Sequence, residues 1–457
     1  MLTETRGFAS VAERNAFYKK AASLILPMAL QNLINVGVTA TDIILLGKVG
    51  ETVLSGASLA GQIQFIMTLI FFGVTSGASV LIAQYWGKKD VDAIEKVMGI
   101  ALKIAVVTGA LFTAAALFFS GYLMRIYTAE PAVIAEGVKY LRIVGISYLF
   151  NAVSMVYLNL IRSVERVIIS TVVYALSLAL NFIIDVILIF GYLGFAPMGV
   201  KGAAIGTLIA RILEFVIMVI YAVWMNDTVK IRLRYCLHMD PVLLGDFFKY
   251  ALPVTFNEMA WGVAFSMNAA IIGHLGSAAV AANSVAQVVR QLAMVISFGV
   301  SSAAAIMVGK AIGEADSASA VLYAEKLRTV SVVCGVVGAG LVLLLRPFVI
   351  SQMTLSALAA DYLYHMIGVM AVYLMLQSHN TLVIVGVLRG GGDTRYGLLV
   401  DALSMWCYSI PLGFIGAFVL KLDTKIVYMM LMSDELLKLP FCIARFRSRK
   451  WVRDVTR

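Results

Sequence analysis

The chain has 457 residues and a formal net charge of +10, and 61% of its residues are hydrophobic whereas only 14% are charged. Together with a mean hydropathy of +0.92, this composition excludes an ordinary soluble globular protein and indicates a membrane protein with many spans. The basic excess follows membrane topology and favours anionic lipid, so we expect membrane lipid as a partner and no nucleic acid.

Twelve segments are long and apolar enough to cross a bilayer as helices, for which about 20 residues are needed. Their apolar runs are continuous rather than alternating, which favours helices over the strands of a barrel. The predicted spans cover residues 21–46, 62–86, 97–120, 140–162, 168–191, 201–224, 248–273, 285–311, 326–349, 362–387, 394–419 and 424–445. The sequence therefore predicts an all-α integral membrane protein.

Basic residues collect after the even-numbered spans, for example at Lys88, Arg166 and Arg447. Such residues mark the cytoplasmic side of a membrane protein. No short apolar core with a cleavage site precedes the first span, so no removable signal peptide is evident. We expect a multi-pass protein of the plasma membrane with both termini in the cytoplasm.

The second half of the chain repeats the first. Shifting the sequence by 226 residues aligns 26–90 with 252–316 without a gap, and the tripeptide FGV at 72–74 meets FGV at 298–300. Agreement through two spans and both loops indicates two six-helix repeats.

Each repeat contains an even number of spans, so both run through the membrane in the same direction. We expect an N-lobe at residues 1–225, a basic cytoplasmic linker at 226–247 and a C-lobe at 248–457. Two such lobes around a central cleft are typical of transporters that expose a site to each side of the membrane in turn.

Two carboxylates lie inside predicted spans, Asp42 in the first and Asp185 in the fifth. Asn181, four residues before Asp185, shares its helix face. A hairpin folded at residues 191–202 brings Thr207 level with Asp185. These oxygen donors suit a bound Na⁺, and neighbouring carboxylates equally suit a shared proton. Both ions stay open.

Intramembrane carboxylates are usually functional, and the repeat argues against a purely packing role here. The second-half counterpart of Asp42 is the uncharged Asn268. Three further polar residues are candidates for a substrate cavity. Gln31 and Asn35 precede Asp42 in the first span, and Glu258 in the seventh span either attracts a cationic substrate or pairs with a buried base.

The stretch LPMALQNLINVGVTATDIILLGKVG, the glycine-rich LRGGGDTR at 388–395 and the ending ARFRSRKW resemble the multidrug and toxic compound extrusion (MATE) family. The resemblance implies two six-helix lobes and cation-driven antiport. It also implies a cation site in the N-lobe, built from an aspartate in the first span, Asn-x-x-x-Asp in the fifth and Thr in the sixth. Here these are Asp42, Asn181, Asp185 and Thr207. A proline that often follows the asparagine is replaced by Phe182.

The sequence therefore predicts a Na⁺- or H⁺-coupled antiporter that exports small organic, often cationic or amphipathic, compounds and works as a monomer without a cofactor. A flippase for lipid-linked saccharides is the alternative, although the spans show few cations for a pyrophosphate head group. An enzyme is not expected, because the four histidines lack ligand spacing and no phosphate-binding GxxxxGK[ST] loop occurs. The cysteines are widely spaced, which predicts free thiols.

Other charged residues have simpler interpretations. Arg211 and Glu214 are three residues apart on one helix and are expected to pair. Arg290 is expected to extend to the membrane surface from the end of its span, and Asp401 to accept a hydrogen bond inside the bundle. Asp393 is expected to cap the eleventh span. Three charged residues of the last span have no assigned partner: Asp434, Glu435 and Lys438.

Overall fold

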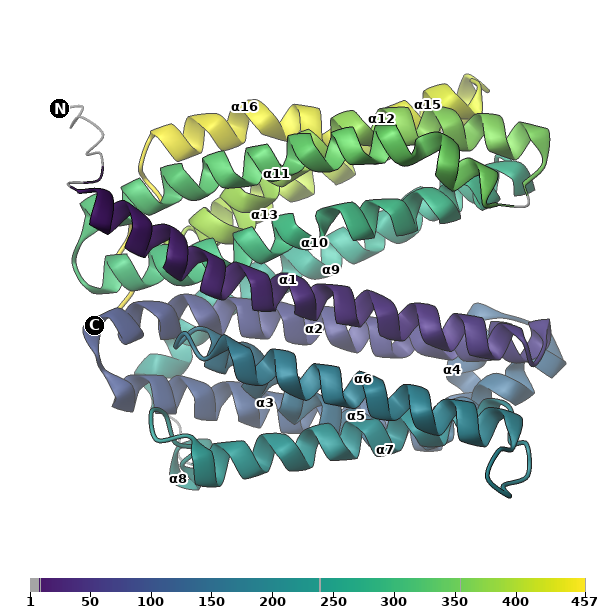
Figure 1. Cartoon of the computed structure of the whole chain (residues 1–457), viewed down its shortest axis with the longest axis horizontal. Helices are drawn as coiled ribbons and strands as arrows, with labels where there is room; N and C mark the ends of the chain where they lie inside the picture. Colours follow the sequence, from purple (N-terminus) through teal and green to yellow (C-terminus); the bar gives the residue numbers. More distant parts are fainter. Residues whose placement is uncertain (1–7, 9, 238–239, 354, 457) are drawn as a thin grey trace. The chain divides into compact units, whose positions relative to one another are not determined.

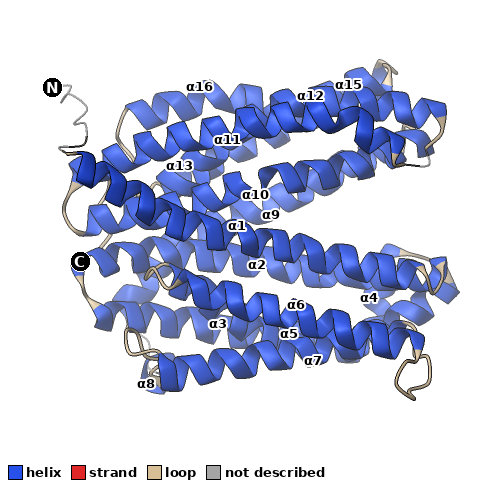
Figure 2. Cartoon of the chain, in the orientation of Figure 1, coloured by secondary structure: helices blue, strands red, loops and turns tan. Residues whose placement is uncertain are grey.

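The computed structural model describes residues 8, 10–237, 240–353 and 355–456, and the side chains of 38–44, 47 and 51 lie outside the described part. Every element within those ranges is helical, without strands (Figure 2). The helices are α1 (Val11–Gly47), α2 (Glu51–Lys88), α3 (Val91–Phe118), α4 (Ser120–Tyr127), α5 (Pro131–Arg162), α6 (Val167–Phe190), α7 (Val200–Ile220), α8 (Leu233–Leu237), α9 (Pro241–Gly273), α10 (Ser277–Gly313), α11 (Ser317–Ser351), α12 (Ala357–Thr381), α13 (Thr394–Ser404), α14 (Ile410–Phe414), α15 (Thr424–Leu431) and α16 (Asp434–Arg447). Four π-helical segments adjoin them: η1 (Tyr221–Met225), η2 (Leu382–Leu388), η3 (Met405–Ser409) and η4 (Ile415–Val419).

The twelve predicted spans are helical over nearly all of their length, although a turn at residues 432–433 divides the last one between α15 and α16, so the predicted fold class is confirmed. Within the described residues, nine helices are long and apolar enough to cross a membrane. The helices extend beyond the apolar segments. α10, for example, begins at Ser277, well before the predicted start of that span at residue 285.

The chain divides into two compact units, which are described separately. The N unit comprises Leu30–Ala78 and Asp90–Ala251, and the C unit comprises Met1–Ala29, Ser79–Lys89 and Leu252–Arg457. The first part of α1, up to Ala29, therefore packs with the second half of the sequence.

Small residues let helices of the N unit approach closely. A Cβ atom added at Gly109 of α3 would lie 2.8 Å from the Ala152 Cβ of α5, and one at Gly145 of α5 would lie 2.4 Å from the Ala116 Cβ of α3. Such contacts are typical of helix pairs in membranes, where van der Waals packing replaces the hydrophobic effect between helices. In Figure 1, α3, α5, α6 and α7 run along one another.

The predicted linker, which belongs to the N unit, contacts α3 through a buried carboxylate of that helix. The Lys230 N–H donates to Glu95 Oε1 at 2.9 Å, and Arg232 Nε lies 2.5 Å from Glu95 Oε2. The Glu95 side chain is only 3% exposed. A backbone N–H donor and the Arg232 guanidinium therefore compensate its burial.

The C unit has its own apolar core. Helices α9, α10, α12 and α15 contribute fully or nearly fully buried side chains, including Ala264, Ala282, Met370 and Val427. The four cysteines are free, as predicted.

The sequence repeat is accompanied by repeated local structure. Gly50 and Gly276 both have positive φ, at 156° and 113°, where a side chain would strain the turn. Asp90 and Asp316 both cap the next helix, each accepting a hydrogen bond from the backbone N–H three residues later, at 3.0 and 2.9 Å. Equivalent positions in the two halves thus end one helix and begin the next in the same way.

Candidate cation and substrate sites

Asn181 and Asp185 lie one turn apart on the face of α6 that packs against α7. Both side chains are buried, and Asp185 is 0% exposed. A Cβ atom at Gly206 of α7 would lie 1.9 Å from Asp185 Oδ1. The absent side chain at Gly206 therefore makes the space that the carboxylate occupies.

The α6–α7 hairpin has the alignment that the sequence predicts. Thr207 directly follows Gly206, so it lies beside the level of Asp185, and its side chain is half-buried. Further along, Ser177 Oγ of α6 donates to the Ala210 carbonyl of α7 at 3.4 Å. The turn closes through the Met198 N–H, which donates to the Leu188 carbonyl at 2.9 Å.

The amide of Asn181 is unusual for a buried group. Neither its Oδ1 nor its Nδ2 has a hydrogen-bond partner among the residues that the structure describes. An unsatisfied buried amide is costly, and its oxygen is a suitable ligand for a cation. Asp42 belongs to α1, but its side chain lies outside the described part, so its predicted place beside Asp185 stays a prediction.

A second buried carboxylate occurs farther along α7. Glu214 is 0% exposed, and its Oε2 lies 2.6 Å from Arg211 Nη1. The predicted ion pair is therefore confirmed.

The substrate-cavity candidates of the first span differ in environment. Gln31 is buried, and its Oε1 accepts hydrogen bonds from Arg162 Nη1 at 3.1 Å and Ser170 Oγ at 3.4 Å. Asn35, one turn farther along α1, is exposed.

Glu258, the candidate of the C unit, forms an ion pair with Arg389. The Glu258 Oε1 to Arg389 Nη2 distance is 2.6 Å, and the two side chains are 14% and 3% exposed. This is the buried base that the sequence offered as one of two interpretations of Glu258.

Lys438 stands at the centre of a buried polar cluster in the C unit. Its Nζ lies 3.1 Å from Asp401 Oδ1, 2.9 Å from Asp434 Oδ2 and 3.2 Å from Glu435 Oε1. Asp401 also accepts a hydrogen bond from Asn257 Nδ2 at 3.0 Å, which confirms its predicted role inside the bundle. The sequence did not assign partners to Lys438. Asp434 and Glu435 lie one turn away on the same helix, α16, whereas Asp401 comes from α13, which is distant in the chain.

Two other predictions about charged residues are wrong. Asp393 occupies the N-cap position of α13, but its carboxylate makes no capping hydrogen bond and instead binds Arg445 at 2.6 Å and Arg453 at 3.2 Å. Arg290 does not reach the membrane surface, since it is 8% exposed. α10 begins at Ser277, which places Arg290 roughly 20 Å along the helix.

The comparison with known families decides the assignment of the chain. A model of the MatE family matches residues 27–187 and again residues 253–415. This chain belongs to the MatE family. The two MatE matches begin 226 residues apart, which is the offset of the repeat seen in the sequence.

Relatives of this MatE chain extend over nearly its whole length. A protein named probable multidrug resistance protein NorM, from Agrobacterium fabrum, is 25% identical over 433 residues, covering 90% of this chain and 92% of the relative. A NorM protein from Thermotoga maritima is 22% identical over 438 residues, covering 95% and 93%.

Solved MATE structures share the fold. One described as MATE in the bent conformation has a TM-score of 0.85 at 18% identity and covers 95% of this chain and 96% of its own. Another, described as an outward-facing multidrug resistance MATE family transporter, has a TM-score of 0.84 at 19% identity, covering 95% and 97%. This MatE chain is therefore an integral membrane protein of a transporter family with the MATE fold.

Proposed function

We propose that this MatE chain is a secondary antiporter that exports small organic compounds, often cationic or amphipathic, and is driven by inward movement of Na⁺ or H⁺. The multidrug resistance names of the relatives support the substrate class. The observation that supports cation coupling is the buried pair of Asn181 and Asp185 on α6. Asp185 packs against Gly206, where a side chain would collide with its carboxylate.

The donor set suits either ion. Na⁺ binds oxygen ligands, and Asp185, the Asn181 amide oxygen and the Thr207 hydroxyl supply three kinds of them. A proton is equally suited, because two carboxylates that are close neighbours in a poorly solvated site, as the sequence predicts for Asp42 and Asp185, resist double ionisation.

Coupling follows if the ion and the substrate prefer different conformations of the protein. An ion at Asp185 stabilises the conformation that binds the ion best, and the substrate stabilises the other conformation. Each ligand therefore shifts the equilibrium between the two conformations by its differential affinity for them. We further propose that the chain works as a monomer with both termini in the cytoplasm.

Efflux of a cationic dye from liposomes under imposed Na⁺ or H⁺ gradients tests this function. Asp42→Asn and Asp185→Asn are expected to abolish the gradient dependence. Gly206→Ala is expected to reduce it strongly, because the added methyl group meets Asp185 Oδ1.

Gly340→Ala is the matched control, since Gly340 lies on the exposed side of α11 and an added Cβ there has no neighbour within 4 Å. Gradient-driven efflux that survives both aspartate substitutions would contradict the proposed coupling. Movement of a lipid-linked saccharide without dye efflux would favour a flippase instead.

A further inference from the structure

The guanidinium of Arg162, the last residue of α5, has an uncharged partner. Its Nη1 donates to Gln31 Oε1 of α1 at 3.1 Å, and Ser170 Oγ of α6 donates to the same oxygen at 3.4 Å. Gln31 and Ser170 are buried, whereas Arg162 is half-buried. Among the residues that the structure describes, no carboxylate oxygen lies within 4.0 Å of the Arg162 side chain. A positive charge that is partly buried without a counter-charge is costly.

The second half of the chain contains the same arrangement, with a carboxylate in place of the glutamine. Arg389 follows Glu258 by 131 residues, just as Arg162 follows Gln31 by 131 residues. Both members of the second pair come 227 residues after their counterparts, within one residue of the offset of the repeat. In the C unit, Arg389 Nη2 and Glu258 Oε1 form an ion pair at 2.6 Å. The repeat thus shows a carboxylate as the partner of an arginine in this position.

The other carboxylates inside the predicted spans of the N-lobe do not supply the missing charge. Glu214 already pairs with Arg211 at 2.6 Å. Asp42 lies eleven residues beyond the glutamine on α1, roughly 16 Å along the helix, and Asp185 lies near the far end of α6. The surroundings of Arg162 are therefore separate from the proposed cation site, and each can be altered alone.

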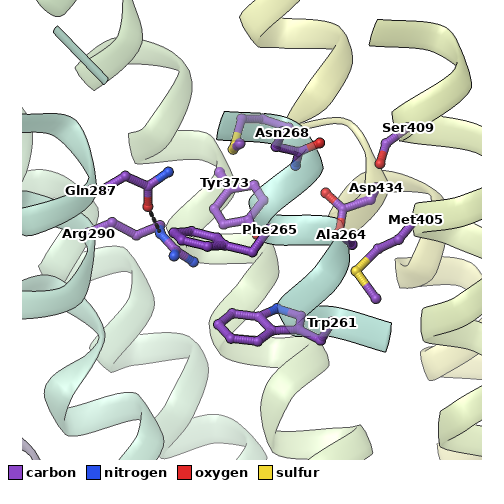
Figure 3. Close-up of a pocket in the computed structure, with 11 residues that line it drawn as sticks. Trp261, Ala264, Phe265, Asn268, Gln287, Arg290, Tyr373, Met405, Ser409 and Asp434 are labelled. Atoms are coloured by element: carbon purple, nitrogen blue, oxygen red, sulfur yellow. Dashed lines mark hydrogen bonds between the residues drawn. The ribbon is translucent and has the colours of Figure 1, made fainter. Parts of the chain in front are cut away.

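A buried arginine bonded to a glutamine also occurs in the C unit, but in a different setting. Arg290 Nε donates to Gln287 Oε1 at 2.9 Å, and both side chains line a small pocket together with Asp434 (Figure 3). This cavity measures about 30 Å³, which is about the share of one water molecule in the liquid. It is too small for an organic ligand, so Arg290 provides a control for Arg162.

We propose that Arg162 binds the carboxylate of an organic ligand, in the position that the Glu258 carboxylate occupies beside Arg389 in the repeat. The planar fork of an arginine holds a carboxylate through two parallel N–H donors. Only one nitrogen of the Arg162 fork is engaged by a described residue, Gln31.

The class of ligand rests on the proposed export function. An amphipathic compound that carries a carboxylate gains a contact at Arg162 that its ester lacks. The basic residues predict that α5 ends on the cytoplasmic side of the membrane, which is the side from which an exporter takes up its substrate. Arg162 is therefore expected to favour zwitterionic compounds over purely cationic ones.

Equilibrium binding of two dyes to the purified full-length protein, without any ion gradient, tests the proposal. Rhodamine B carries a free carboxylate, and its ethyl ester has the same cationic ring system without that charge. Rhodamine B is expected to bind about ten- to hundredfold more tightly than the ester, because it gains hydrogen bonds between charged groups. Equal binding of the two dyes would overturn the carboxylate site and leave the proposed export of organic compounds standing. Because no gradient is present, a failure of the proposed coupling does not alter this result.

Two variants locate the contact. Arg162→Gln removes the charge and is expected to weaken rhodamine B binding by about ten- to hundredfold, without changing the binding of the ester. Gln31→Glu keeps the arginine and gives it the kind of partner that Arg389 has in the repeat. This variant is expected to weaken rhodamine B binding to a similar degree, since the fork is then occupied. A preference for rhodamine B that survives both substitutions would overturn the proposal.

Two other arginines are the matched controls. Arg166 lies four residues beyond Arg162, is exposed and donates to Thr228 Oγ1 at 3.2 Å, so Arg166→Gln tests whether any nearby positive charge suffices. Arg290→Gln tests a buried arginine bonded to a glutamine elsewhere. Both controls should keep the preference for rhodamine B. A loss in either control as large as that in Arg162→Gln would contradict the assignment.

The head group of an anionic lipid is the rival occupant of the site. The dye measurements are therefore repeated in micelles that contain phosphatidylglycerol, which is anionic, or phosphatidylcholine, which is not. The preference for rhodamine B is expected to be the same in both. Its loss with phosphatidylglycerol alone would assign Arg162 to a lipid phosphate and overturn the proposal.

Discussion

Replacing Lys438 by methionine should strongly destabilise the C unit. Its ammonium is the common partner of three carboxylates at 2.9–3.2 Å, and its side chain is 3% exposed. Methionine is unbranched like lysine and only one atom shorter, and it removes the charge. Removing one partner of a buried ionic group costs about 3–5 kcal/mol, because the remaining charges stay buried without compensation.

The free energy of unfolding is measured on the protein in mixed detergent micelles, by titration with a denaturing detergent. Lys139→Met is the matched control, since Lys139 also pairs three residues away, with Glu136 at 2.6 Å, but its side chain is 46% exposed. Exposed pairs contribute little, so this variant should stay close to the wild type.

A second substitution separates charge from packing. In the Lys438→Met background, Glu435→Gln should restore part of the lost free energy of unfolding, because it removes one of three buried carboxylates. A Lys438→Met variant within about 1 kcal/mol of the wild type, or a double variant less stable than the single one, would refute the reasoning.

Two further predictions concern the end of the chain in the C unit. Gln84 is 0% exposed, donates to the Gly390 and Arg453 carbonyls and accepts from the Val455 N–H at 2.8 Å. Gln84→Ala should therefore abolish the hydrogen-exchange protection of the Val455 amide and lower the free energy of unfolding by about 1–3 kcal/mol. The pKa of Asp454 lies below its usual value of 3.8, since burial raises it but hydrogen bonds from Thr456 and Lys88 lower it more. The contribution of the Asp454 carboxylate to the stability of the fold is therefore present above about pH 4 and is lost as the pH falls through the lowered pKa. Protection of the Thr456 amide, which donates to Asp454 at 2.9 Å, should fall in that range while Val455 stays protected. Parallel loss at both amides would contradict this.

The sequence was sufficient for features that depend on local periodicity. Spans follow from apolar length, and the alignment of Thr207 with Asp185 follows from a short turn that forces two helices to run back along each other. The pairing of Arg211 with Glu214 follows from helix geometry alone. These features need no knowledge of distant contacts.

The polar clusters of the C unit could not be predicted from the sequence, for a physical reason. Lys438 meets Asp401 and Asn380 is bound to Glu435, although these residues lie far apart in the chain. A membrane helix is apolar on its lipid-facing and its buried side, so periodicity does not reveal which faces meet. Arg290 was misplaced because the small residues from Ser277 onward lower the hydropathy of a segment that is nonetheless helical.

Substrate-driven cation movement in sealed liposomes tests the central claim most directly. The liposomes start with a gradient of an organic cation and with no gradient of Na⁺ or H⁺. The movement of Na⁺ or H⁺ across the membrane is then recorded. Because coupling is reciprocal, the account predicts cation movement opposite to the substrate in the wild type and none in Asp185→Asn. Undiminished cation movement in Asp185→Asn would contradict it.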